Sequence, residues 1–191
     1  MATITNQAAL SYNGVTTLSN IAVGELMEVL TATKTAADTT YTAGGVKTFV
    51  ISLVNSSAAA LTGLTVTDTL GSYTFSGNTL YPLTYVTGSL LYYVNGALQA
   101  TPTVTATAPL TVTGVTVPAG GSAMLIYTAR VNEYAPLGVE DSITNTATIT
   151  GGGLTSSVTA TETINASPAP QLAISKSISP TMVAENGTLT Y

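Results

Sequence analysis

Apolar and polar residues alternate with a period of two along much of this chain, and threonine fills many of the polar positions. In the segment 143–150 every second residue is a threonine, and the positions between are apolar or asparagine. The segments 4–10 and 64–70 follow the same alternation. Because successive side chains of a strand point to opposite faces, this pattern predicts half-buried β-strands with a β-branched solvent face.

Turn-forming residues separate the alternating segments. Examples are Asn13-Gly14, Asn95-Gly96 and the run Gly151-Gly152-Gly153. These residues readily adopt the positive φ angles that tight hairpins need. The segment 24–30 is the best helical candidate, and it continues more naturally as the approach to a strand. Short, closely spaced strands without a credible helix predict an all-β protein with an antiparallel β-sandwich.

The two ends of the chain repeat parts of its middle. Ile4-Thr5-Asn6 matches Ile143-Thr144-Asn145, and the surroundings of Lys34 match those of Lys176. Internal self-similarity of this kind indicates repeated structural units. The chain is therefore expected to be one whole sandwich flanked by partial-repeat strands at both termini.

This repeat frame predicts four segments. Residues 26–165 form the complete domain, and residues 1–25 form a hairpin resembling its last strands. Residues 166–170, which contain two prolines, form a short stiff linker. Residues 171–191 resemble the first strands of a following, partial repeat.

Composition narrows the function classes. The chain has four basic and nine acidic residues, a net charge of −5, and neither histidine nor cysteine. Nucleic acid and anionic membranes are therefore not expected as partners. Imidazole or thiolate metal sites and histidine-based triads are excluded. Only 7% of the residues are charged, which favours a structural or assembly protein over an enzyme and predicts no cofactor.

One acidic loop carries side chains of the kind that bind calcium. Glu133, Glu140 and Asp141 could ligate Ca²⁺ together, but a solvated acidic loop is the favoured interpretation. No metal is therefore predicted.

Three polar residues, Lys34, Asp68 and Asn145, each fall on the apolar face of a predicted strand. Burying a lone charge is costly, so the three side chains are expected to meet. They are the components of an intramolecular isopeptide bond. A neutral Lys34 amine would attack the Asn145 side-chain carbonyl, while a protonated Asp68 polarises that carbonyl and shuttles protons as ammonia leaves. The alternative is a buried Lys–Asp ion pair with Asn145 completing its hydrogen bonds.

Four short strings occur in a characteristic order along the chain: Thr33-Lys34-Thr35, Leu53-Val54-Asn55, the segment 65–70 and the segment 144–148. Together they resemble the repeat family catalogued as domain of unknown function 11, found in bacterial and archaeal surface proteins. The opening segment 2–8 is similar to clostridial members, some of which are similar to spore-appendage components. The resemblance implies an Ig-like sandwich in a surface stalk or fibre, without enzymatic activity.

The partial repeats lead to two functional hypotheses. The first is a structural subunit of an extracellular or spore-surface fibre, in which copies of the chain assemble head-to-tail by strand addition through their termini. Asn6 and Lys176, which occupy the repeat positions of Asn145 and Lys34, mark the assembling segments. A covalent Lys176–Asn6 link is disfavoured, because neither terminal segment supplies a counterpart of Asp68.

The alternative is a passive stalk repeat of a longer surface adhesin. The first 24 residues carry no basic residue and no uninterrupted apolar run, so no secretory signal peptide is evident.

Overall fold

Two six-stranded sheets form the body of the molecule. The computed structural model describes residues 2–26, 28–167, 175–179, 181–188 and 190. The first sheet consists of β5 (Leu30–Ala36), β7 (Val46–Asn55), β11 (Leu83–Tyr85), β12 (Leu91–Val94), β13 (Ala97–Gln99) and β16 (Ser122–Val131). Its order is β13-β12-β16-β7-β5, and β11 also pairs with β16.

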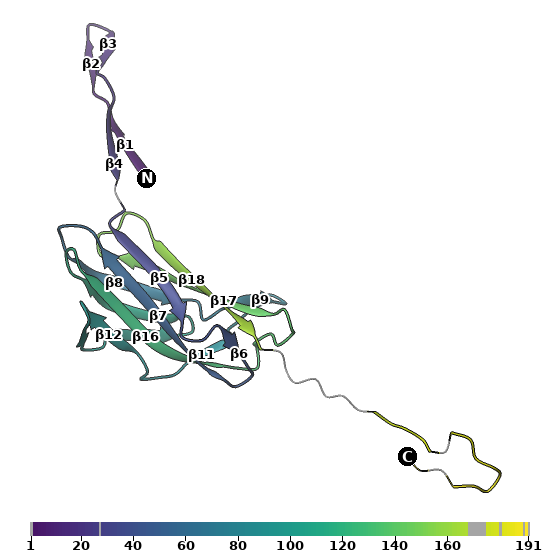
Figure 1. Ribbon diagram of the computed structural model, residues 1–191. Coiled ribbons are helices and arrows are strands. Elements are labelled where there is room, and N and C mark those ends of the chain that lie inside the picture. The colour runs from purple at the N-terminus through teal and green to yellow at the C-terminus, as the bar shows by residue number, and fades with distance from the viewer. Residues whose placement is uncertain (1, 27, 168–174, 180, 189, 191) are drawn as a thin grey trace.

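The second sheet faces the first across the core (Figure 1). It consists of β6 (Thr40–Tyr41), β8 (Leu61–Asp68), β14 (Thr103–Thr107), β15 (Leu110–Val117), β17 (Ser142–Gly151) and β18 (Val158–Ala166). Its order is β14-β15-β8-β17-β18-β6. Neighbouring strands of both sheets run antiparallel, except that β6 pairs with β18 in parallel. The all-β sandwich predicted from the sequence is confirmed.

The alternation of the sequence explains which faces are buried. Along β17, Ile143, Asn145, Ala147 and Ile149 are buried, while the threonines between them point outward. β7 and β16 alternate in the same way. The inward faces of both sheets form one continuous hydrophobic core, as expected for a sandwich whose strands each carry one apolar face.

Smaller hairpins complete the fold. β9 (Tyr73–Phe75) pairs with β10 (Asn78–Leu80) at the edge of the sandwich. No part of the chain that the structure describes forms a helix long and apolar enough to cross a membrane.

The N-terminal hairpin projects from one end of the sandwich (Figure 1). β1 (Ala2–Asn6) pairs with β4 (Ala22–Leu26), and further out β2 (Ala9–Tyr12) pairs with β3 (Val15–Leu18). Asn13 and Gly14 close the tip with φ angles of 49° and 78°, as a two-residue hairpin turn requires. An isolated two-stranded hairpin is only marginally stable in water, so this element lacks the support that β17 and β18 receive from the rest of their sheet.

The C-terminal segment lies beyond the opposite end of the sandwich (Figure 1). Its described residues are all exposed and make one isolated bridge, between Ser179 and Thr190. Leu172 and Ile174, which the repeat frame assigns to the first strand of a partial repeat, lie outside the described residues. Strand pairing here is limited to that bridge among the described residues, because the segment has no neighbouring sheet to extend.

Candidate functional site

Four strands from both sheets bring polar side chains to one point in the core. Lys34 comes from β5 and Tyr127 from β16 of the first sheet, while Asp68 ends β8 and Asn145 lies on β17 of the second sheet. The backbone register places Asp68 directly opposite Ala147, two residues beyond Asn145. The three residues predicted from the sequence therefore lie together, and Tyr127 joins them.

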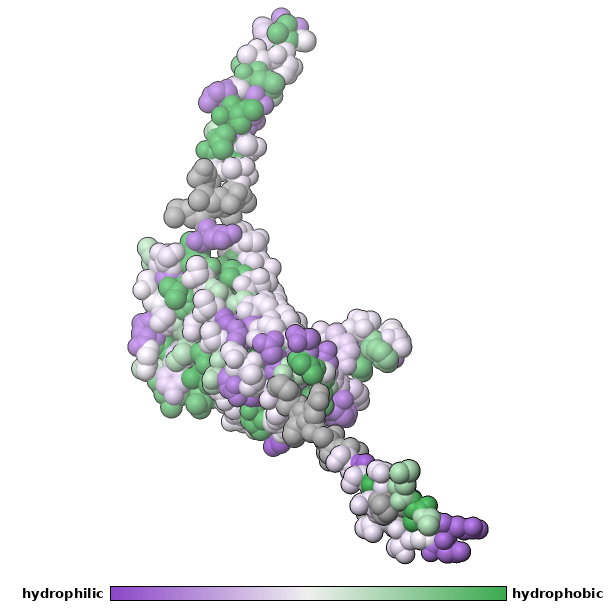
Figure 2. Space-filling model, turned by 45° about the vertical axis from the view of Figure 1, so that its right-hand side comes forward, coloured by the Kyte–Doolittle hydropathy of each residue, from purple (hydrophilic) through white to green (hydrophobic). Residues whose placement is uncertain are grey.

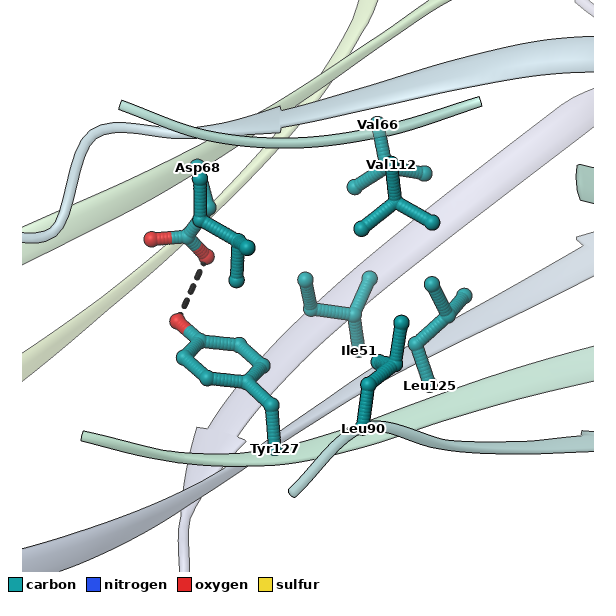
Figure 3. A pocket seen from close by; sticks show the side chains of 8 residues that line it. Ile51, Val66, Asp68, Leu90, Val112, Leu125 and Tyr127 are labelled. Atoms are coloured by element: carbon teal, nitrogen blue, oxygen red, sulfur yellow. Dashed lines mark hydrogen bonds between the residues drawn. The ribbon is translucent and has the colours of Figure 1, made fainter. Parts of the chain in front are cut away.

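Hydrogen bonds connect these four side chains. The Lys34 ammonium contacts Asp68 Oδ2 and also donates to the Tyr127 hydroxyl oxygen at 3.3 Å. The Tyr127 hydroxyl donates to Asp68 Oδ2 at 2.7 Å (Figure 3). Asn145 Nδ2 donates to the same Tyr127 oxygen at 3.0 Å. Tyr127 is thus the common partner of the lysine, the aspartate and the asparagine.

The Asn145 carbonyl oxygen has its own pair of donors. Thr69 Oγ1 and the Gly71 backbone N–H each donate to Asn145 Oδ1 at 3.2 Å. The other Asp68 oxygen, Oδ1, accepts the Leu70 backbone N–H at 3.0 Å. The sequence predicts that Asp68 polarises the carbonyl. In the structure Thr69 and Gly71 make those contacts, because Asp68 faces Lys34 and Tyr127 instead.

The cluster is dry. Lys34, Asp68 and Asn145 are 4%, 1% and 0% exposed. The Lys34 nitrogen lies 5.1 Å from the centre of the Phe49 ring and 5.8 Å from that of Tyr127. Beside Asp68 and Tyr127, aliphatic side chains of both sheets enclose a cavity of about 10 Å³ (Figure 3).

Burial changes the acid–base behaviour of the cluster. Desolvation lowers the pKa of Lys34, and the nearby Asp68 opposes this effect only in part. Desolvation also raises the pKa of Tyr127 well above its ordinary value, and the Asp68 charge adds to this rise. Lys34 is therefore more readily present as a neutral, nucleophilic amine than an exposed lysine, while Tyr127 keeps its proton.

This arrangement contains the parts needed to form an amide between two side chains. It has an amine of lowered pKa, a carboxylate in contact with that amine, and a carboxamide held by donors on its oxygen. A purely structural ion pair would need only a lysine and a carboxylate. The described side chains in the core also include no unpaired buried nitrogen or oxygen atom, so the cluster is fully satisfied.

Sequence reasoning missed Tyr127, although a signal for it was present. Tyr127 shares the inward face of β16 with Leu125 and Ala129. A tyrosine on such a face needs a partner for its hydroxyl group, and a buried Lys–Asp–Asn cluster supplies several.

The residues proposed for assembly lie apart from this cluster. Asn6 is exposed at the end of β1, where it pairs with Ala22. Lys176 is exposed in the C-terminal segment. Both lie on the extensions rather than in the sandwich.

The acidic loop offers no metal site among the described residues. No group of three or more acidic side chains there is placed to hold an ion. Asp141 Oδ2 instead accepts the Gly138 backbone N–H at 2.5 Å, which makes it part of the loop's own structure.

Comparisons with known proteins identify similar folds rather than relatives in sequence. No protein-family model matches the chain, and no curated protein matches it. The pilus backbone protein RrgB of Streptococcus pneumoniae has a TM-score of 0.50 at 14% identity, over 63% of this chain and 31% of RrgB. A variant of the major pilin subunit BcpA of Bacillus cereus has a TM-score of 0.50 at 15% identity, over 86% of this chain and 48% of BcpA.

A domain of an adhesin has a similar fold as well. The N-terminal domain of the Streptococcus gordonii adhesin Sgo0707 has a TM-score of 0.50 at 14% identity, over 80% of this chain and 35% of the adhesin structure. The chain thus spans less than half the length of each of these structures. At such identities the likeness concerns the fold alone, and it agrees with the Ig-like sandwich expected from the sequence.

Proposed function

We propose that this chain is a structural subunit of an extracellular or spore-surface fibre, assembling with other copies of itself head-to-tail through its termini. It acts as a building block rather than as an enzyme, and it uses no cofactor, nucleic acid or membrane partner. The sandwich shared with pilin subunits supports this proposal, as does a surface with few charges. We also propose that the chain belongs to the domain of unknown function 11 repeat family, whose strings coincide here with strands β5, β7, β8 and β17.

The observation that carries the proposal is the N-terminal hairpin. Its outer half presents Leu10, Tyr12 and Val15, which are 74%, 77% and 67% exposed. Figure 2 shows apolar side chains along this extension, clear of the sandwich. Exposed apolar area costs on the order of 25 cal/mol per Å² relative to burial. A hairpin with apolar side chains and open strand edges therefore favours docking on another chain.

The partner we propose is the C-terminal segment of a second copy. Residues 171–191 of one subunit would add beside residues 1–25 of the next, in the way that strands complement an open sheet edge. The two segments leave the sandwich at opposite ends (Figure 1). A contact between different surfaces of identical subunits does not close on itself, so it propagates into a filament.

Truncation tests this assembly. Deleting residues 1–25 should leave a folded, soluble monomer that forms no filaments, as seen by electron microscopy and light scattering. Filaments from the truncated chain would contradict the mechanism. An intact chain that stays monomeric at high concentration would favour the alternative, a passive stalk repeat of a longer adhesin.

We further propose that Lys34 and Asn145 form an internal isopeptide bond with the loss of ammonia. The contact of Lys34 with Asp68 and the lowered pKa of the amine support this reaction. Asn145 also donates a hydrogen bond to the Tyr127 hydroxyl that Lys34 contacts, which keeps the two side chains close. The bond would join the first strand of one sheet to a central strand of the other.

Two measurements test the bond. The intact mass of the wild type should be lower than the mass calculated from its sequence by one ammonia. The Lys34→Ala variant should have the full mass calculated from its own sequence. A protease site inserted at the exposed Ser76-Gly77 turn adds a check that is independent of mass. After denaturation and cleavage, the wild-type halves should migrate as one branched polypeptide, while those of Asn145→Ala should separate. Separate wild-type halves would leave Lys34 and Asp68 as a simple buried ion pair.

A further inference from the structure

The Asn145 carboxamide is hydrogen-bonded at both its oxygen and its nitrogen. Its oxygen accepts hydrogen bonds from Thr69 Oγ1 and the Gly71 N–H, both at 3.2 Å. Its nitrogen donates to the Tyr127 hydroxyl at 3.0 Å. Any asparagine accepts hydrogen bonds through its oxygen and donates through its nitrogen, but in a reacting amide the partners at both ends also have chemical tasks. Negative charge develops on the oxygen, and a proton must reach the nitrogen before it can leave.

We propose that Thr69 and Gly71 form an oxyanion pocket for the Asn145 carbonyl, and that the Tyr127 hydroxyl protonates the leaving nitrogen. This assignment rests on the proposed Lys34–Asn145 bond and names the groups that make it. Asp68 then acts as the base that takes a proton from the attacking amine. Different groups therefore stabilise the oxyanion, protonate the leaving nitrogen and take a proton from the amine.

The protons balance along this path. The neutral Lys34 amine attacks the Asn145 carbon, and the carbonyl π electrons move to the oxygen held by Thr69 and Gly71. The attacking nitrogen gives one proton to Asp68 Oδ2. The Tyr127 hydroxyl transfers its proton to the departing nitrogen and takes the proton from Asp68 in return. The carbon–nitrogen bond of the carboxamide breaks, ammonia leaves, and the carboxylate and the phenol are regenerated.

The contacts place Tyr127, and not Asp68, at the leaving group. Asp68 Oδ2 contacts Lys34 and accepts the Tyr127 hydroxyl, while Oδ1 accepts the Leu70 backbone N–H. Both carboxylate oxygens are therefore directed to other donors. The hydroxyl of Tyr127 bridges from the carboxylate to Asn145 Nδ2, and the raised pKa of Tyr127 means that this hydroxyl is protonated before the reaction.

The turn after β8 is built to present the Gly71 donor. Gly71 is buried with a φ of 70°, and an added Cβ would lie 2.3 Å from Ile143 Cγ2. Leu70 before it also has a positive φ, 52°, which is uncommon for a residue with a branched side chain. The chain thus adopts an uncommon backbone conformation at Leu70, while the donor itself is a glycine, which tolerates positive φ.

Tyr127→Phe tests the proton donor. The chain is made by cell-free translation, and its intact mass is followed from the end of synthesis. Ammonia loss should slow by about 100-fold or more, the usual effect of removing a general acid. Tyr92→Phe is the matched control, because the buried Tyr92 hydroxyl bonds Thr116 outside the cluster and its loss should leave the rate unchanged.

Thr69→Val tests the oxyanion pocket, with Thr69→Ser as the variant that keeps the hydroxyl. Thr69→Val should slow ammonia loss by about 100-fold, and Thr69→Ser should restore most of the rate. Circular dichroism establishes that each variant is folded before its rate is compared.

The outcomes separate the roles of Tyr127 and Thr69 from the bond itself. A wild-type chain that never loses ammonia overturns the bond and, with it, both roles. A wild-type chain that reacts, together with a folded Tyr127→Phe variant reacting within about 2-fold of it, leaves the bond in place and overturns the role of Tyr127. A folded Thr69→Val variant with the wild-type rate overturns the pocket in the same way.

Discussion

The Lys34 side chain is buried where a charge is poorly solvated, and this burial lowers the pKa of its amine. Desolvation is the largest influence on its pKa, and the attraction of Asp68 only partly offsets the lowering. A more distant attraction from Glu162 acts in the same direction as Asp68. The lowered pKa of Lys34 therefore comes from its position between the sheets rather than from a strong base beside it.

The lowered pKa of Lys34 predicts how stability changes with pH when the bond cannot form. In Asn145→Ala, the unfolded chain binds more protons than the folded one between the lowered pKa and the ordinary 10.5. The free energy of unfolding should therefore rise as the pH increases through this window. Urea titrations between pH 7 and pH 10 measure the effect. Above about 10, the raised pKa of Tyr127 reverses the slope, because the unfolded tyrosine ionises first.

The control for this pH dependence removes only the amine. Lys34→Met in the Asn145→Ala background keeps the volume of the side chain but no longer titrates. The rise in stability toward pH 10 should then disappear. A slope that survives this substitution would mean that another group, and not Lys34, carries the dependence.

Gly71 is a buried position where a single added methyl group should destabilise the fold. Gly71→Ala forces a side chain into a φ of 70° and against Ile143. A positive φ costs a residue with a Cβ about 1–2 kcal/mol, and overpacking costs about 1–3 kcal/mol more. We expect a loss of about 2–5 kcal/mol in the free energy of unfolding, measured by urea denaturation.

Gly88 separates the two causes. It has a φ of 80°, but an added Cβ would meet nothing within 4 Å. Gly88→Ala should therefore cost only about 1–2 kcal/mol. Equal losses at Gly71 and Gly88 would show that crowding against Ile143 is unimportant.

The sequence predicts the meeting of Lys34, Asp68 and Asn145 because strand alternation alone assigns each to an inward face. The roles of Thr69 and Gly71 depend instead on how the chain turns after β8. That turn requires positive φ at Leu70 and Gly71, which no periodic pattern encodes. Tyr127 lies between these cases, since its inward face was predictable and its partners were not.

At the level of elements, β17 organises the second sheet. It pairs with β18 on one side and with β8 on the other, so Asn145 sits on a central strand and has little freedom to move. The alternation of threonine and apolar residues predicted this strand well. The two-residue strand β6, which pairs in parallel with the end of β18, is too short to leave a pattern in the sequence.

The outer half of the N-terminal hairpin has two different faces. Tyr12 pairs with Val15 and Leu10 pairs with Thr17, so Leu10, Tyr12 and Val15 share one face, since directly opposed residues point to the same side. The opposite face carries Ser11 and Thr16 near the tip, and Ala9 and Leu18 farther from it. The apolar face is the one that we expect to be covered in a filament.

Replacing this apolar face should weaken assembly. Burying a leucine or valine side chain contributes about 1.5–3 kcal/mol. Leu10→Ser combined with Val15→Ser should therefore raise the concentration needed for filament formation by at least about 100-fold, measured by sedimentation. Thr16→Ser on the opposite face is the control and should assemble like the wild type. Equal loss in both variants would mean that neither face is specifically buried.

At the scale of the whole molecule, a Lys34–Asn145 bond would enclose most of the sandwich. Lys34 lies in β5, where the first sheet begins along the chain, and Asn145 lies in β17, next to the closing strand β18 of the sandwich. Tension applied between the two ends of the chain would then pass from β5 to β17 through the bond. The strands between them would carry none of it, which suits a subunit that transmits load along a fibre.

The same closure predicts a large energetic coupling between Lys34 and Asn145. Closing a loop of roughly 100 residues stabilises a protein by about 4–5 kcal/mol, chiefly by restricting the unfolded chain. Either substitution by itself, Lys34→Met or Asn145→Ala, abolishes the bond. The double variant should therefore lose about 4–5 kcal/mol less in unfolding free energy than the sum of the two single losses. Urea unfolding of the wild type, the two single variants and the double variant at one pH measures this difference. If the bond does not form, Lys34 and Asn145 are linked through hydrogen bonds and the ion pair with Tyr127 and Asp68. The coupling free energy between the two substitutions should then be about 1 kcal/mol. A small coupling would thus place Lys34 and Asn145 in a hydrogen-bonded network, whereas a large one requires that they be joined.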